Sequence, residues 1–410
     1  MKKIKGTITT PRGFKAAGVR CGIKKNRPDL ALIYSEVPAT SFGMFTTNRV
    51  KAAPVKLSIQ RIRKKYAQAI VINSGIANAC TGKKGLEDAD KMSEIAAKEL
   101  KIEKEEILVA STGKIGKFLP MTKIEKGIKQ AINELSYQGG EKTAEAILTT
   151  DTTIKQIVIE TDIPARGKGK VKIAGIAKGS GMISPNLATM LCFITTDACI
   201  APDALEGALK GAVNKSFNQV SIDGDMSTND SVFILANGLA KNERVKTWRK
   251  KKKLRIEDEN FSYFCKALDY LCISLAKMIA RDGEGATKLM EIKVRGGAFP
   301  KEVRRIAKAV AISPLVKTAI AGASPNWGRV MSALGSAHTH IDTEKVDVYF
   351  EEILVVKKGE AAGFEREKLK EILEKDEVKI TIDLHRGSCE TIFWGCDLTE
   401  EYVKINKRYF

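Results

Sequence analysis

The sequence predicts a mixed α/β (α+β) fold, in which strands and helices are both common but do not alternate strictly. Short apolar runs rich in β-branched residues recur along the chain, as expected for buried strands. Stretches with apolar residues three and four positions apart, as in amphipathic helices, lie between some of these runs. Because other strand-like runs follow one another directly, a layered sheet-and-helix arrangement fits better than a plain doubly wound sheet.

Each expected strand is apolar and is bounded by polar or glycine-containing segments, whereas each expected helix carries its apolar residues on one face. The final part of the chain reads as strand, helix, strand and strand. The expected strands comprise residues 31–35, 69–73, 107–111, 155–160, 171–176, 190–195, 346–356, 378–384 and 391–396. The expected helices comprise residues 88–100, 121–135, 141–148, 203–217, 261–280, 301–312 and 366–374.

The size of the chain, 410 residues and 44.8 kDa, predicts two or three domains or one large fold in two parts. Hydrophobic residues make up 43% and charged residues 29%, so the chain can bury a sizeable core and is not disordered as a whole. No apolar run reaches the roughly 18 residues that span a bilayer. The basic start of the chain lacks the apolar stretch of a signal peptide, so we expect a cytoplasmic protein with no membrane partner.

The net charge of +20 permits a nucleic-acid partner without requiring one. The densest basic cluster, KTWRKKKKLR at residues 246–255, is expected to be a solvated surface loop. Only Trp248 could stack on a base there, and no RRM or KH pattern occurs. We therefore expect no nucleic acid, and RNA binding through this cluster stays an alternative.

Cysteine and histidine offer little for metal binding or catalysis. None of the eight cysteines forms a CxxC pair, so zinc-ligand spacing is absent. Only three histidines occur, and His338 and His340 have no third ligand nearby in the sequence. We expect no metal site, and the chemistry must be carried by other residues.

Two glycine-rich segments follow expected strands and offer backbone N–H groups. STGKIG at 111–116 and AGIAKGSG at 174–181 match neither the P-loop nor the GxGxxG pattern. Their N–H groups could hold a phosphate or a developing oxyanion. The second segment leads through PNLA into an apolar run that begins at Thr189. Taken alone, this threonine reads either as the first residue of a buried strand or as a nucleophile where a loop enters the core.

Long motifs in a fixed order resemble the ornithine acetyltransferases, also called glutamate N-acetyltransferases. The resemblance covers nearly the whole chain, which makes it far more specific than a single glycine pattern. The motifs are GFKAAGVRCGIKKNRPDLALI (13–33), MFTTNRVKAAPV (44–55), INSGIANACTG (72–82), STGKIGKFLPM (111–121), AILTTDTTIK (146–155), AKGSGMISPNLATM (177–190), SFNQVSIDGDMSTND (216–230), RDGEGATK (281–288), SPNWGRV (324–330) and WGCDLTEEYVKIN (394–406).

The resemblance implies a self-cleaving enzyme with an N-terminal nucleophile. Cleavage between Ala188 and Thr189 would give chains of residues 1–188 and 189–410. It would free an α-amine, whose ordinary pKa of about 8 lets it act as general base for the threonine hydroxyl. The implied fold is the layered type of the ornithine acetyltransferase and DmpA-like group, with a smaller C-terminal α/β part.

By the same resemblance, Thr189 takes the acetyl group from N2-acetylornithine and passes it to L-glutamate, a step of arginine biosynthesis. Thr112 and Gly113 would stabilise the oxyanion. Substrate contacts would come from Thr152, Lys178, Glu284 and Asn406, as well as from Thr189 itself. No cofactor is implied, although acetyl-CoA stays open as a second acetyl donor, and relatives assemble from two copies of each cleaved chain.

The chain departs from the usual family pattern at three places. It ends at Phe410 without the hydroxyl-bearing residue that contacts substrate in relatives. Ile76 stands where an asparagine is usual, and Lys114 stands where an aliphatic residue is usual. None of these positions is the nucleophile, so acyl transfer is still expected. The alternative enzyme reading is an aminopeptidase of the same self-cleaving class.

Overall fold

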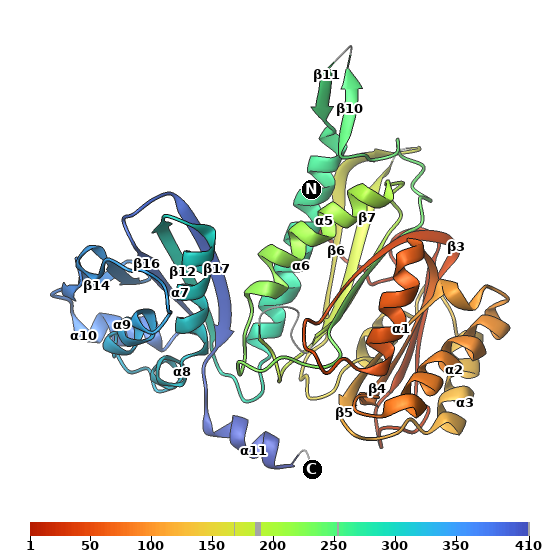
Figure 1. Ribbon diagram of the computed structural model, residues 1–410, viewed down its shortest axis with the longest axis horizontal. Coiled ribbons are helices and arrows are strands. Elements are labelled where there is room, and N and C mark those ends of the chain that lie inside the picture. The colour runs from red at the N-terminus through yellow and green to blue at the C-terminus, as the bar shows by residue number, and fades with distance from the viewer. Residues whose placement is uncertain (168, 185–189, 252–253, 409–410) are drawn as a thin grey trace. The chain divides into compact units, whose positions relative to one another are not determined.

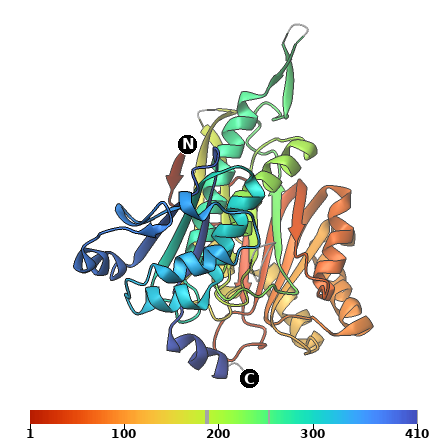
Figure 2. The same ribbon diagram turned by 60° about the vertical axis from the view of Figure 1, so that its left-hand side comes forward.

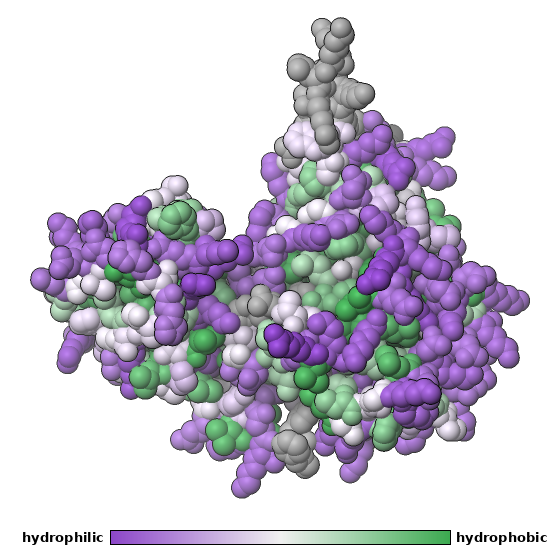
Figure 3. Space-filling model, in the orientation of Figure 1, coloured by the Kyte–Doolittle hydropathy of each residue, from purple (hydrophilic) through white to green (hydrophobic). Residues whose placement is uncertain are grey.

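A computed structural model describes residues 1–167, 169–184, 190–251 and 254–408. The chain forms two compact units. The first comprises Met1–Gly179, Asn186–Asn218 and Met226–Leu275, and the second comprises Ser180–Pro185, Gln219–Asp225 and Ala276–Phe410. These units are defined by packing, and each contains residues from both sides of the expected cleavage site. The two chains expected from cleavage stay a prediction. Figure 3 shows hydrophilic residues over most of the visible surface.

The first unit is built on a nine-stranded mixed sheet with the order β1-β6-β7-β8-β9-β3-β4-β5, in which β2 pairs with β3 (Figure 1). The β4–β5 and β8–β9 pairs are parallel and the other neighbours are antiparallel. Its strands are β1 (Lys2–Ile4), β2 (Phe14–Val19), β3 (Leu30–Phe45), β4 (Tyr66–Ile76), β5 (Ile107–Lys114), β6 (Lys155–Ala165), β7 (Gly169–Lys178), β8 (Leu191–Thr196) and β9 (Ser231–Ala236). Its helices are α1 (Ala53–Arg61), α2 (Gly82–Leu100), α3 (Met121–Asn133), α4 (Gly140–Ala146), α5 (Pro202–Lys215) and the start of α6 (Glu259–Arg281).

Alternation along the central strands supplies apolar side chains to both faces of this sheet. On β5, Ile107 and Val109 pack in a cluster with residues of α2 and α3, whereas Leu108 and Ala110 belong to a second cluster. That second cluster includes residues of α4, β8 and β9. Because each fully buried large aliphatic side chain contributes roughly 1.5–3 kcal/mol, these two layers hold the sheet between them.

The second unit has a six-stranded sheet with the order β15-β14-β13-β16-β12-β17. Figure 2 shows its strands and helices from a second direction. Its strands are β12 (Leu289–Gly297), β13 (Asp347–Phe350), β14 (Ile353–Lys357), β15 (Glu360–Ala361), β16 (Glu377–Asp383) and β17 (Cys389–Cys396). Its helices are α7 (Pro300–Ile312), α8 (Pro314–Ala321), α9 (Gly328–Gly335), α10 (Arg366–Leu373) and α11 (Glu400–Arg408). One apolar cluster joins the sheet to α7, α8, α9 and α10.

The expected mixed α/β class is confirmed, and two local expectations are wrong. Residues 346–356 form two antiparallel strands, because the chain turns at Glu351, whose φ is 47°. Within the basic cluster 246–255, residues 248–251 and 254–255 are not a loop but belong to two antiparallel strands, β10 (Trp248–Lys251) and β11 (Leu254–Glu257). Among the described residues, no helix combines the length and the apolar character needed to cross a membrane.

One fully buried carboxylate holds the loop between β2 and β3. The Asp29 carboxylate accepts hydrogen bonds from the backbone N–H groups of four consecutive residues, 21–24, at 2.6–3.1 Å. The four amides therefore point at one carboxylate, which fixes the path of the loop and the starting direction of the Lys24 side chain. Such bonds to a charged group contribute about 1.5–3 kcal/mol each when isolated.

Replacing Asp29 by Ala leaves these amides without an acceptor in a buried place. We expect the free energy of unfolding to fall by about 3 kcal/mol or more, measured by urea denaturation. Asp29→Asn keeps one acceptor oxygen and should lose less. An Asp29→Ala variant as stable as the wild type would contradict the assigned role.

Candidate active site

The predicted oxyanion donors lie at the end of β5, where it runs parallel to β4. Thr112 is paired with Ser74 and Gly113 with Gly75, and Thr112 is 4% exposed. Gly113 has a φ of 128°, and a Cβ on it would lie 2.2 Å from the carbonyl carbon of Gly75. Only glycine fits this contact, so the backbone at 113 is held against β4 without any side chain.

Hydrogen bonds from two directions anchor this loop. The Asn229 side-chain amide donates to the carbonyls of Ser111 (2.8 Å) and Ala77 (2.6 Å). Ser111 in turn donates its hydroxyl to Asn73 at 2.6 Å. The backbone N–H of Ala77 donates to the Lys114 carbonyl. The backbone of the predicted donors is therefore fixed before any substrate binds, as oxyanion stabilisation requires.

The residue after the predicted nucleophile is held by a buried acid. Ala188 and Thr189 themselves lie outside the described residues. The backbone N–H of Met190 donates to Asp230 Oδ1 at 3.0 Å, and Asp230 is 1% exposed. Burial raises the pKa of Asp230 well above its ordinary value, against the opposing effects of the Met190 N–H and of Lys178. Since Asn229 and Asp230 are consecutive, one short segment binds both the oxyanion loop and the strand that follows Thr189.

A buried ion group lies at the end of β7. Lys155 Nζ is 2.7 Å from Asp151 Oδ1, and Lys178 Nζ is 3.9 Å from Asp151 Oδ2. The Gly179 N–H also donates to Asp151, at 2.6 Å. Burial alone would raise the pKa of Asp151, but the charges of Lys178 and Lys155 outweigh it and hold that pKa below its ordinary range.

Two of the predicted substrate contacts belong to this group. Lys178 is paired with Leu191 between β7 and β8, so it lies beside the strand that follows Thr189. Thr152 directly follows Asp151 in the chain and is exposed. The first unit therefore contains Thr112, Gly113, Thr152 and Lys178.

The other two predicted contacts belong to the second unit and meet each other there. The Asn406 side-chain amide on α11 donates to Glu284 Oε2 at 2.9 Å. The Glu284 backbone N–H donates to the carbonyl of Ser180 at 2.7 Å. A Cβ on Gly181 would lie 2.5–2.6 Å from the Glu284 carboxylate, so this carboxylate rests directly on the glycine backbone.

The sequence analysis missed four residues that organise the predicted site residues of the first unit, namely Asp151, Lys155, Asn229 and Asp230. A usable signal existed for Asp230, because it directly precedes the fully buried strand Ser231–Ala236. A carboxylate at the entry of such a strand needs a partner. Among the described residues, no group of three or more His, Cys, Asp and Glu side chains is placed to hold a metal ion.

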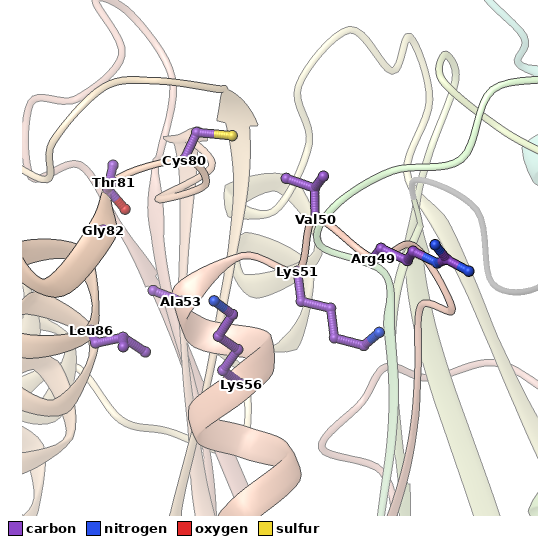
Figure 4. Close-up of a pocket in the computed structure, with 9 residues that line it drawn as sticks. All are labelled: Arg49, Val50, Lys51, Ala53, Lys56, Cys80, Thr81, Gly82 and Leu86. Carbon is purple, nitrogen blue, oxygen red and sulfur yellow. The ribbon is translucent and has the colours of Figure 1, made fainter.

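A surface pocket of about 190 Å³ lies elsewhere in the first unit (Figure 4). None of the predicted site residues lines it. The Lys56 side chain extends toward the segment 80–82, whereas Arg49 and Lys51 extend away from it. The pocket is lined by Arg49, Val50, Lys51, Ala53, Lys56, Cys80, Thr81, Gly82 and Leu86.

Comparison with known proteins finds matches to one family over nearly the whole length of this chain. The profile described as the ArgJ family matches residues 15–410. The arginine biosynthesis bifunctional protein ArgJ of Caldanaerobacter subterraneus subsp. tengcongensis is 46% identical, with 100% of each chain covered. That of Thermotoga neapolitana is 47% identical over 97% of this chain and 99% of its own. The chain therefore belongs to the ArgJ family, which confirms the family expected from the motifs.

Solved structures of the same family also match. The crystal structure of ArgJ from Bacillus halodurans is 44% identical and covers 52% of this chain and 97% of its own, with a TM-score of 0.48. The ornithine acetyltransferase of Mycobacterium tuberculosis, complexed with ornithine, is 36% identical, covers 45% of this chain and 97% of its own, and has a TM-score of 0.41.

Asp151→Asn removes the carboxylate that lies 2.7 Å from Lys155 Nζ and 3.9 Å from Lys178 Nζ. We expect a loss of about 3–5 kcal/mol in the free energy of unfolding at pH 7, because both buried lysines lose the negative charge of this carboxylate. The pKa of Asp151 is lowered in the folded state, so its contribution is complete above its ordinary pKa of 3.8 and is lost as the pH falls below it. The difference between wild type and variant should therefore shrink in acid.

Urea denaturation at several pH values measures this. Asp162→Asn is the matched control, because Asp162 is 42% exposed and pairs with Lys170 at the surface. That change should cost no more than about 1 kcal/mol. Equal losses for the two variants would contradict a special role for the buried group.

Proposed function

We propose that this chain is an acetyltransferase that moves the acetyl group of N2-acetyl-L-ornithine to L-glutamate. The products are L-ornithine and N-acetyl-L-glutamate, and the reaction serves arginine biosynthesis. One observation carries the proposal: the ArgJ family match extends over residues 15–410. The same match favours acetyl transfer over peptide hydrolysis by an aminopeptidase. The substrates are small molecules, and no cofactor is required.

Maturation generates the nucleophile. The Thr189 hydroxyl oxygen attacks the carbonyl carbon of Ala188, the C–N bond between the two residues breaks, and water hydrolyses the resulting ester. The products are chains 1–188 and 189–410, and the new α-amine of Thr189 receives a proton as it leaves. Since the pKa of such an amine lies near 8, it can then remove the hydroxyl proton as a general base.

Acetyl transfer then follows in two half-reactions. Thr189 Oγ attacks the acetyl carbonyl of N2-acetylornithine, and ornithine leaves with its amine protonated. The amine of glutamate attacks the acetyl-threonine ester, which releases N-acetylglutamate and restores the hydroxyl. Each tetrahedral intermediate carries an oxyanion, which the Thr112 hydroxyl and the Gly113 N–H stabilise. The fixed backbone of this loop supports the assignment, because pre-positioned donors need no reorganisation during the reaction.

Charged groups orient the substrates. Lys178 binds a substrate carboxylate by a charge-assisted hydrogen bond. Its burial at 2% exposure supports this role, because a desolvated ammonium binds an anion more strongly than an exposed one. Glu284, held by Asn406, binds an ammonium of the substrate or of Thr189. Thr152 contributes a hydroxyl contact. Two copies of each cleaved chain form the active assembly.

Intact mass spectrometry tests the maturation step. Wild type should give two fragments that meet at Ala188 and Thr189, whereas Thr189→Ala should stay uncut because it has no attacking hydroxyl. Thr189→Ser keeps a hydroxyl and should still be cut. Cleavage of the alanine variant at the same bond would contradict a self-generated nucleophile.

Thr112→Val tests the oxyanion donor with little change in side-chain volume. We expect kcat for acetyl transfer to fall about 10²–10³-fold, as for loss of one oxyanion donor elsewhere. The measurement is N-acetylglutamate formation from acetylornithine and glutamate. A valine variant with wild-type kcat would remove Thr112 from the mechanism.

A further inference from the structure

Lys24 is a partly buried lysine whose ammonium is bonded to backbone carbonyls. Its Nζ donates to the carbonyl of Leu148 at 2.9 Å and lies 3.5 Å from that of Ala146. Within the described residues it forms no ion pair. The carboxylate of Asp29, an acid in the same loop, accepts hydrogen bonds from the backbone N–H groups of residues 21–24. An ammonium has three donors, so Lys24 keeps one for another acceptor.

The Lys24 side chain lies next to the oxyanion loop. A Cβ on Gly75 would lie 3.2 Å from Lys24 Cγ, and one on Gly113 would lie 2.2 Å from the Gly75 carbonyl carbon. Lys24 and Gly113 therefore both contact Gly75. The same lysine is bonded to Leu148, which lies three residues before Asp151. It thus adjoins both groups of predicted site residues in the first unit, the oxyanion donors and the ion group around Asp151.

The two acids whose charges act on Lys24 already have other partners. Asp29 accepts the N–H groups of residues 21–24, and Asp151 lies 2.7 Å from Lys155 Nζ and 3.9 Å from Lys178 Nζ. The pKa of Lys24 is lowered to about 8, mainly by burial; the charge of Asp29 and, more weakly, that of Asp151 oppose this shift, whereas those of Arg27 and Lys178 add to it. A partly buried ammonium that forms no ion pair within the described residues is costly, which points to an anion supplied by a ligand.

We infer that Lys24 binds the side-chain carboxylate of the acidic amino-acid acceptor and so determines acceptor specificity. This inference rests on the proposed acetyl transfer to glutamate. Glutamate carries two carboxylates, and Lys178 and Lys24 supply one cation for each. The donor substrate instead carries an ammonium at the end of its side chain.

Lys24→Met tests the inference, because methionine keeps most of the apolar stem and removes the charge. The reaction has two half-reactions, so kcat/KM is measured separately for glutamate and for N2-acetylornithine. We expect kcat/KM for glutamate to fall about 10–100-fold, the value of one charged hydrogen bond. The value for acetylornithine should change less than about threefold, and Lys24→Arg should recover part of the glutamate activity.

L-Norvaline, which has the glutamate α-carbon groups but no side-chain carboxylate, is the second acceptor. The wild-type preference for glutamate over norvaline should shrink in Lys24→Met by the same factor. Lys123→Met is the control, since exposed Lys123 donates to the Gly22 carbonyl of the same loop and should leave both constants unchanged.

Each outcome is decisive. Equal losses for both substrates, or an unchanged preference for glutamate over norvaline, would mean that Lys24 acts only on the structure of the loop. If the wild type makes N-acetylglutamate and Lys24→Met makes it equally well, this inference is overturned and the proposed function stands. A wild type that makes none overturns the proposed function, and the inference with it. Self-cleavage at Ala188 and Thr189, scored in each variant, reports whether the variant has folded.

Discussion

The arrangement of the first unit depends on the buried carboxylate of Asp151. It joins Lys155 at the start of β6, Lys178 at the end of β7 and the backbone of Gly179. The lysines stabilise the ionised carboxylate in its buried position, and the carboxylate in turn allows two ammonium groups to remain buried. The end of β7 is therefore fixed beside β8, and the charge of Lys178 is held next to the strand that follows the nucleophile.

The segment before β9 connects this charged region to the oxyanion loop. Asn229 satisfies two carbonyls that flank the glycine contact between β4 and β5, and Asp230 holds the N–H of Met190. Neither interaction touches a substrate by itself. Because Asn229 and Asp230 are consecutive, the two interactions together fix the distance between the predicted oxyanion donors and the start of β8. Pre-organised catalysis requires such fixed positions.

Much of the fold was predictable from the sequence, since β4 to β8, β16, β17 and the helices α2, α3, α5, α6 and α7 follow from apolar periodicity, whereas the central strands β9 and β12 were not expected. The turn at Glu351 was not, because both halves of residues 346–356 are apolar and the break depends on one backbone angle. The site was accessible only through family motifs. Thr112 or Lys178 alone reads as a turn or a surface charge, and the buried partners Asp151 and Asn229 gain meaning only when strands far apart in sequence are brought together.

The order of strands has a consequence for the assembly of the cut protein. In β7-β8-β9-β3, the two middle strands belong to residues 189–410 and both flanking strands to residues 1–188. After the proposed cut, the second chain is inserted between two strands of the first and is hydrogen-bonded on both sides. Separating the chains would break both ladders at once, so they behave kinetically as a single molecule. Halves produced apart would have to open a finished sheet before they could combine, whereas one continuous precursor forms the interleaved sheet first and is divided afterwards.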